Sequence, residues 1–152
     1  MIEMPGGSAF TEARQQKKLT LVRRANPGIR ALNASFDHFI DLDGKPTKEE
    51  TQVLERLLRY GPRPTSDSAG RSTVAFGRRM LVVPRLGTVS PWSSKATDIA
   101  HSCGLTRVRR IERGILYVLV GEVIDEAALR RAVHDRMTES ILEHTSDAAK
   151  LF

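Results

Sequence analysis

Apolar and polar residues follow one another along this chain with the spacings of both helices and strands. Residues 8–24 have the pattern of a basic amphipathic helix, and Asn26-Pro27-Gly28 ends it. Residues 29–42 alternate between apolar and polar side chains, which predicts a half-buried strand or a bent pair of strands. Thr47 and Glu50 have the spacing of a capping box, so a second helix is expected to begin there.

Further elements follow residues 64–77, which are rich in Ser, Gly, Thr and Arg and predict a loop. Residues 80–83 predict a short buried strand. Residues 105–112 and 115–121 predict an antiparallel hairpin with its turn at Arg113-Gly114. The second strand of this hairpin is almost wholly apolar, so we expect it at the centre of a sheet.

Two more helices are expected in this part of the chain. The first is delimited by Ser90 as N-cap and by Gly104 at its end. Its inner face is an apolar stripe formed by Trp92, Ala96, Ile99, Ala100 and Cys103. Asp125 is predicted to cap a last long helix that packs residues as far as Leu142, and a short amphipathic tail is expected from Ser146.

The composition is that of a globular protein with an excess of basic residues. Hydrophobic residues make up 40% and charged residues 28%, and no apolar run has the length of a membrane span, so no membrane partner is expected. The 24 basic and 18 acidic residues give a net charge of +6, which allows binding of nucleic acid, an anionic substrate or an acidic partner. The N-terminus lacks a secretory signal pattern, and a single cysteine excludes an internal disulfide framework, so we expect a cytoplasmic location.

Hydroxyl side chains gather where the helix at Ser90 begins. Backbone N–H groups at a helix start favour an anion, and capping alone requires one hydroxyl. We therefore expect this segment to face a phosphate, a carboxylate or a neighbouring domain. The alternative is that the hydroxyls only cap the helix and shape the turn. The candidate residues facing substrate or an interface are Arg85, Thr88, Ser90, Ser93, Ser94 and Lys95.

The other reactive side chains do not form a recognisable catalytic or metal site. Cys103 lies at the end of its helix, where the helix dipole opposes a thiolate, and we expect it to be buried in the apolar stripe. The histidines lack the spacing of a zinc site, and no phosphate-cradling nucleotide loop occurs. We therefore expect no catalytic residue, metal or cofactor in this chain. Four arginines of the predicted hairpin could face solvent, a neighbouring domain, a phosphate or RNA: Arg107, Arg109, Arg110 and Arg113.

Several stretches together resemble one known family. The longest is PRLGTVSPWSSKATDIAHSCGL at residues 84–105, and the others are residues 36–39, 54–62, 110–114, 134–139 and 150–152. They resemble the N-terminal part of the large, single-chain phosphoribosylformylglycinamidine synthase, also called formylglycinamide ribonucleotide amidotransferase. Leu86 departs from the family pattern, which would have a proline there, and residues 64–78 are not recognisable.

The resemblance implies a fold as well as a family. It implies an α+β domain over residues 1–152, built from two pseudo-repeated halves that are similar to the small subunit of the shorter synthetases. Antiparallel sheets would pack on helices in both halves. The expected halves are residues 1–63 and 79–145, joined by the loop 64–78.

The resemblance also implies a role in purine biosynthesis. The parent enzyme would be a glutamine-dependent, ATP-consuming ligase with a synthetase portion, which uses ATP and magnesium, and a glutaminase portion. Both are absent from these 152 residues, so we expect this chain alone to be inactive. It would bridge these two partner domains, help shape the ammonia route and supply one wall of the formylglycinamide ribonucleotide site. The alternative is a stand-alone basic α/β module that binds RNA or another polyanion, which the aromatic content of 5% disfavours.

Overall fold

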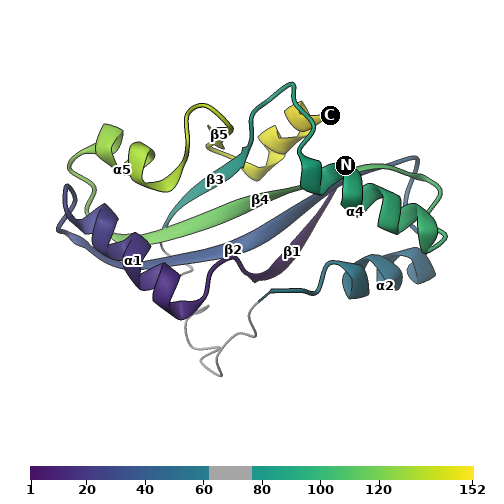
Figure 1. Cartoon of the computed structure of the whole chain (residues 1–152), viewed down its shortest axis with the longest axis horizontal. Helices are drawn as coiled ribbons and strands as arrows, with labels where there is room; N and C mark the ends of the chain where they lie inside the picture. Colours follow the sequence, from purple (N-terminus) through teal and green to yellow (C-terminus); the bar gives the residue numbers. More distant parts are fainter. Residues whose placement is uncertain (62–76) are drawn as a thin grey trace.

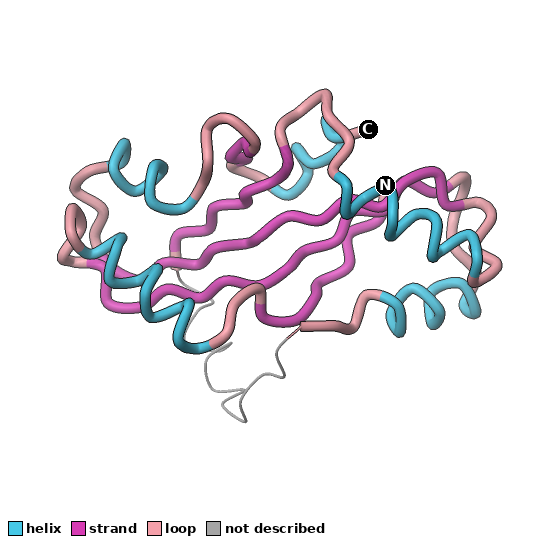
Figure 2. Tube along the Cα trace, viewed as in Figure 1, coloured by secondary structure: helices cyan, strands magenta, loops and turns pink. Residues whose placement is uncertain are grey.

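The computed structural model describes residues 1–61 and 77–152, and it has the predicted α+β architecture. The strands of the described residues form a five-stranded antiparallel sheet in the order β1-β2-β4-β3-β5. Figures 1 and 2 show helices at both ends of this sheet. In chain order the elements are β1 (Ile2–Ser8), α1 (Glu12–Arg23), β2 (Ile29–Leu42), α2 (Lys48–Leu57), β3 (Arg78–Pro84), α4 (Pro91–Ser102), β4 (Val108–Gly121), α5 (Glu126–Val133), β5 (Glu139–Leu142) and the 3-10 helix η2 (Thr145–Leu151).

Local signals fix the start of α2 and the limits of α4 as predicted. Thr47 Oγ1 accepts from the Glu50 backbone N–H at 3.2 Å, and the Glu50 carboxylate accepts from the Thr47 N–H at 2.8 Å, so the capping box is confirmed. Ser90 caps α4 by accepting from the Ser93 N–H at 3.0 Å. Gly104 follows α4 with a φ of +85°. No helix of the described residues is long and apolar enough to cross a membrane.

β2 and β4 form the centre of the sheet, and each has 14 residues. Ile29 at the start of β2 lies opposite Gly121 at the end of β4, and Leu42 lies opposite Val108 at the other end of the pair. The strand and helix that precede β2 have the same lengths as those that precede β4. β1 and β3 have 7 residues each, and α1 and α4 have 12 each. This order agrees with the expected pseudo-repeat, which stays a prediction.

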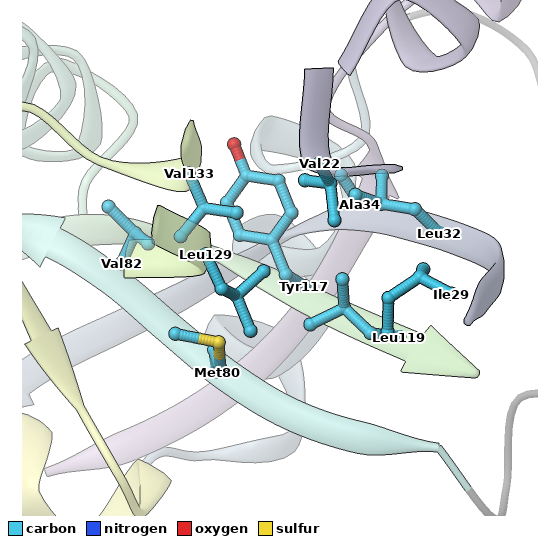
Figure 3. Close-up of a cluster of buried hydrophobic side chains, with 10 residues drawn as sticks. All are labelled: Val22, Ile29, Leu32, Ala34, Met80, Val82, Tyr117, Leu119, Leu129 and Val133. Atoms are coloured by element: carbon cyan, nitrogen blue, oxygen red, sulfur yellow. The ribbon is translucent and has the colours of Figure 1, made fainter. Parts of the chain in front are cut away.

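The four α-helices among the described residues cover the two ends of one face of the sheet. Leu32 and Ala34 of β2 pack in a cluster with side chains of α1 and α5, which Figure 3 shows. Ile40 of the same strand packs with side chains of α2 and α4. Side chains two residues apart on a strand point to the same face, so both clusters lie on one face of the sheet. The middle of this face lies between the two helix pairs (Figure 1).

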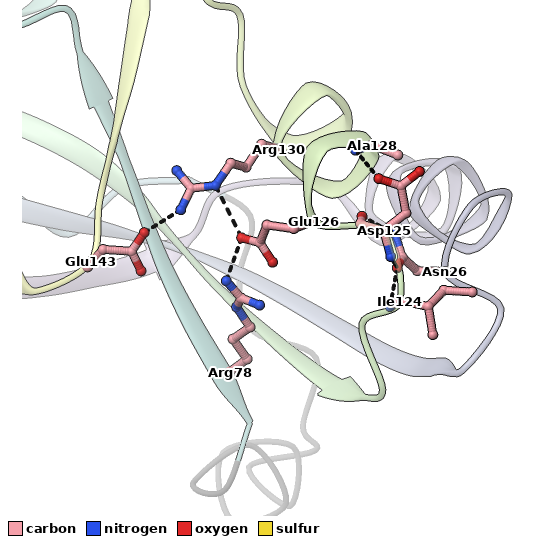
Figure 4. A network of polar contacts seen from close by, with 8 residues as sticks. All are labelled: Asn26, Arg78, Ile124, Asp125, Glu126, Ala128, Arg130 and Glu143. Carbon is pink, nitrogen blue, oxygen red and sulfur yellow. Dashed lines mark hydrogen bonds and ion pairs between the residues drawn. The ribbon is translucent and has the colours of Figure 1, made fainter.

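A buried asparagine joins the end of α1 to the start of α5. Asn26 Oδ1 accepts from the N–H groups of Ile124 and Asp125 at 2.8 Å each, and its Nδ2 donates to the Asp125 carbonyl at 3.0 Å. Three hydrogen bonds from one side chain thus hold this end of the helical layer together. Figure 4 shows these bonds beside the ion-paired network of Arg78, Glu126, Arg130 and Glu143.

The opposite face of the sheet has a smaller core of its own. Its buried side chains come from β2, β3, β5 and η2, and they are Phe39, Leu81, Val83, Leu142, Ala148 and Leu151. The predicted amphipathic tail after residue 146 is therefore confirmed as a 3-10 helix that packs on this face.

Asp37 of β2 is buried, and it lies on the same face as Phe39. Its Oδ1 has no hydrogen-bond partner among the described residues. Burial, followed by the neighbouring charge of Glu3, raises the pKa of Asp37 from its ordinary 3.8 to about 7. The folded protein therefore retains a proton between pH 4 and pH 7 that the unfolded chain has already lost.

Asp37→Asn should stabilise the protein at pH 8 and have little effect at pH 4. The wild type loses stability as the pH rises through this interval because folding then buries a charge, whereas asparagine is neutral throughout. We expect a gain on the order of 2 kcal/mol at pH 8, measured by urea unfolding at both pH values. Equal differences at the two pH values would contradict this prediction.

The predicted hairpin at residues 105–121 is wrong. β4 is one continuous strand, which pairs with β2 through Arg113 and Gly114 without interruption. Gly114 is required by close packing, because a Cβ there would lie 2.9 Å from the Val82 carbonyl oxygen and 3.0 Å from Val83 Cγ1. An Arg-Gly pair that suggests a turn in the sequence therefore marks a position where β3 passes close to β4.

The predicted last long helix is also wrong beyond its first turns. α5 ends at Val133, and the chain turns before β5 begins at Glu139 and pairs with the edge of β3. Asp135 holds this turn, since its side chain accepts from the Met137 N–H and its carbonyl from the Glu139 N–H, each at 2.8 Å. The apolar positions near Leu142 are compatible with a strand as well as with a helix. They form a strand because the unpaired edge of β3 offers hydrogen-bond partners.

The N-terminal helix is shorter than predicted, because β1 occupies residues 2–8 and Thr11 caps α1. Pro5 and the glycines after it disfavour a strand in the sequence, but an edge strand tolerates them. Gly6 lies so close to His38 that a Cβ would come within 2.6 Å of its ring. Residues 64–76 of the predicted loop lie outside the described residues, and Arg78 belongs to β3.

Candidate functional site

The uncovered middle of the helix-bearing face is a groove. Phe36 pairs with Ile115 and His38 with Arg113 across β2 and β4, and these positions lie between the two helix-covered ends. An open cavity of about 630 Å³ lies here. Its walls come from β2, β3, β4, the loop 85–90, the start of α4 and the turn before β5. The lining residues are Phe36, Val82, Val83, Pro84, Arg85, Thr88, Val89, Ser90, Pro91, Trp92, Arg113, Gly114, Ile115, Met137, Thr138 and Glu139.

Arg113 lies among aromatic rings in this groove. Its guanidinium carbon is 4.5 Å from the ring centre of Phe36 and 4.6 Å from that of Trp92. The Tyr60 ring centre is 5.8 Å away, and the Tyr60 hydroxyl accepts from Arg113 Nη1 at 3.3 Å. Cation–π contacts and a hydrogen bond thus hold a positive charge on a largely apolar floor.

Behind Arg113, a chain of hydrogen bonds fixes Tyr60. His38 Nδ1 lies 3.2 Å from the Met4 carbonyl oxygen, which can only accept, so Nδ1 carries the proton. His38 Nε2 then accepts from the Tyr60 hydroxyl at 2.6 Å. Burial and, to a smaller extent, the charge of Arg113 lower the pKa of His38 to about 4, so His38 is neutral at pH 7. Because the Tyr60 hydroxyl donates its proton to His38, its oxygen is free to accept a hydrogen bond from Arg113.

A buried carboxylate faces the start of α4. The side chain of Glu112 accepts from the Ser90 hydroxyl at 3.0 Å and from the Ser90 N–H at 3.3 Å. It also forms an ion pair with Arg110, which donates to the Thr88 carbonyl at 2.8 Å. Glu112 is fully buried. This network fixes the loop 85–90. It also means that the negative charge at the start of α4 comes from Glu112 of the same chain.

The structure brings three of the six candidate residues together. Arg85, Thr88 and Ser90 line the groove. The other three lie outside its lining: Ser93 is buried and interacts with Arg110, whereas Ser94 and Lys95 are exposed.

The inner face of α4 differs in part from the predicted stripe. Ala100 is buried, but Ile99 and Cys103 are exposed, so the expected burial of Cys103 is wrong. The helix ends one residue earlier than the stripe needs. Gly104 reverses the chain there, and Leu105 takes the buried position and donates its N–H to the Ala100 carbonyl at 3.0 Å.

The arginines of β4 and its approach differ in their partners. Arg107 pairs with Glu50, and Arg109 pairs with Asp41 and Asp43. Arg110 pairs with Glu112, as described above. Arg113 makes no ion pair with any described residue, and it lines the groove. The sequence reasoning grouped Arg113 with three other arginines that could face a phosphate, but it left Arg113 out of the six candidate residues because it placed Arg113 in a turn. Across residues 1–61 and 77–152, no cluster of three or more His, Cys, Asp or Glu side chains could hold a metal ion.

The fold and the groove define a class of protein: an α+β domain with an open groove on its sheet that is lined by arginine and aromatic side chains. A family model described as formylglycinamide ribonucleotide amidotransferase N-terminal matches residues 35–152. This chain belongs to that family and is an N-terminal domain of the amidotransferase of purine biosynthesis. The match includes the segment at residues 84–105 and all the residues that line the groove.

Proposed function

We propose that this domain supplies one wall of the formylglycinamide ribonucleotide site and bridges the synthetase and glutaminase portions of its parent enzyme. The observation that carries the proposal is the groove itself. It combines a cation held between aromatic rings with a second arginine, Arg85. Arg85 lies on a loop that the hydroxyls of Thr88 and Ser90 fix by donating to the Arg85 carbonyl and to Glu112. An anionic, hydroxyl-rich ribonucleotide presents groups that match these two arginines.

The rim of the groove supports the bridging role. Val89 is 57% exposed and Met137 is 74% exposed, and both lie at the cavity. Large apolar side chains exposed together favour contact with another protein surface. The groove would then be closed by the synthetase portion, with Ser94 and Lys95 of α4 facing a neighbouring domain. Such a closed interface could also border the ammonia route.

In the full-length amidotransferase, Arg85→Ala should raise the KM for the ribonucleotide roughly fivefold and leave the KM for glutamine unchanged. The reason is the loss of one exposed charge-assisted hydrogen bond at the groove. Lys95→Ala is the matched comparison, because it removes an exposed charge of the same sign outside the groove lining. We expect it to change the glutamine used per amidine formed more than the KM for the ribonucleotide.

Unchanged ribonucleotide KM values in both Arg85→Ala and Thr88→Ala would contradict the proposed wall. Steeply salt-dependent binding of RNA by the protein would instead favour the stand-alone polyanion-binding module.

A further inference from the structure

Arg113 differs from the other arginines near the start of β4 in having its charge uncompensated. Arg107, Arg109 and Arg110 each form an ion pair with a carboxylate. Within the described part of the chain, Arg113 has no such partner, although it lies in a half-buried groove where an unpaired charge is costly. The groove therefore offers a place for a negative charge that no described residue supplies.

The groove also restricts how Arg113 can bind. Phe36 and Trp92 each lie within 4.6 Å of its guanidinium carbon, so contacts through the face of the guanidinium are taken up by rings. Nη1 donates to the Tyr60 hydroxyl, and His38 fixes that hydroxyl from behind. A guanidinium has five N–H donors in a planar fork, so its remaining donors lie at the edge of the plane. A planar fork of this kind suits bidentate binding of a phosphate or a carboxylate.

We propose that Arg113 binds the phosphate group of formylglycinamide ribonucleotide, and that Tyr60 and His38 position its guanidinium for that contact. This inference rests on the proposed function, because it requires the groove to be a wall of the ribonucleotide site. Arg85 lies at the same cavity and can add a second cationic contact to the phosphate. The hydroxyls of Thr88 and Ser90 donate within the chain, to the Arg85 carbonyl and to Glu112. A carboxylate from the synthetase portion is the competing occupant of the same fork.

The experiment compares a ligand with and without the phosphate in the full-length enzyme. The KM is measured for formylglycinamide ribonucleotide, and the inhibition constant is measured for formylglycinamide ribonucleoside as a competitor. Arg113→Ala should raise the ribonucleotide KM about tenfold to hundredfold and change the ribonucleoside constant less than about threefold. Arg113→Lys keeps the charge without the fork and should lie between Arg113→Ala and the wild type. Arg109→Ala is the control, since Arg109 is an exposed arginine of the same strand outside the groove, and it should change neither constant.

Tyr60→Phe tests the positioning residues, because it keeps the ring and removes only the hydroxyl. We expect a threefold to tenfold rise in ribonucleotide KM with kcat unchanged, and again little change for the ribonucleoside. Normal constants in Tyr60→Phe beside a clear loss in Arg113→Ala would overturn the positioning role.

The remaining outcomes separate this inference from the proposed function. If Arg113→Ala weakens the ribonucleotide and the ribonucleoside equally, Arg113 meets a protein carboxylate or another part of the substrate, and the phosphate assignment fails while the groove remains a wall. If no variant of Arg85, Thr88 or Arg113 changes the ribonucleotide KM, the proposed function itself fails.

Discussion

Glu112→Gln is expected to lower the free energy of unfolding by about 3 kcal/mol, because it breaks a buried ion pair by removing one charge. The glutamine keeps the size of the side chain, but its amide group has to face either Arg110 or Ser90, both of which donate to Glu112 in the wild type. This loss of stability is at the low end of the range for broken buried ion pairs, because Arg110 still donates a hydrogen bond to the Thr88 carbonyl at 2.8 Å in the variant. Urea unfolding should show a lower midpoint with an unchanged slope.

The exposed pair between Arg109 and Asp43 provides the matched control. Asp43→Asn also removes one carboxylate charge from an arginine, but both side chains are open to solvent, so its unfolding midpoint should stay at the wild-type value. A Glu112→Gln protein with the wild-type midpoint would show that the charge of Glu112 contributes nothing to the structure of the loop 85–90.

Gly114→Ala is expected to lower the free energy of unfolding by about 3 kcal/mol, at the high end of the range for overpacking. The added Cβ would lie 2.8 Å from Leu81 Cδ1, which can rotate away, and 2.9 Å from the Val82 carbonyl oxygen, which cannot. β3 would have to move away from β4, and their hydrogen bonds would lengthen. Thermal or urea unfolding measures the loss.

Gly87→Ala is the control for Gly114→Ala. It shows how much stability is lost when a glycine is replaced at a position where the new Cβ meets no other atom. Gly87 has a φ of +82°, and a Cβ there would meet nothing within 4 Å. The alanine is therefore expected to cost only about 1 kcal/mol from its left-handed backbone. Equal losses in the two variants would contradict the proposed collision at Gly114.

The sequence predicted those parts of the fold whose signals are local. Thr47 and Glu50 define the start of α2 within four residues, and Ser90 does the same for α4. The prediction of a turn at Arg113 was wrong because the glycine after it is required by another strand, β3. Only the structure shows that β3 passes close to Gly114, and no pattern within β4 reports it.

The groove was predictable only in part for the same physical reason. The segment at residues 84–105 pointed to Arg85, Thr88 and Ser90, since hydroxyls before a helix are a local signal. Arg113 acquires its role from Phe36, Tyr60 and Trp92, which come from three other parts of the chain. Neither the spacing of these three aromatic residues in the sequence nor their residue type indicates that they surround the same arginine.

Glu112 and Arg113 are consecutive residues of β4, so the strand carries the carboxylate that anchors the loop on one face and the cation of the groove on the other. Their separation is set by covalent geometry alone. A shift of β4 by one residue against β2 would turn each of the two side chains to the opposite face of the sheet, so that Glu112 would lie on the face of the groove and Arg113 on the face of the loop. Single-residue insertions or deletions in β4 upstream of this pair are therefore a more severe kind of change for this domain than most substitutions, because both sites lose their proper charge at once.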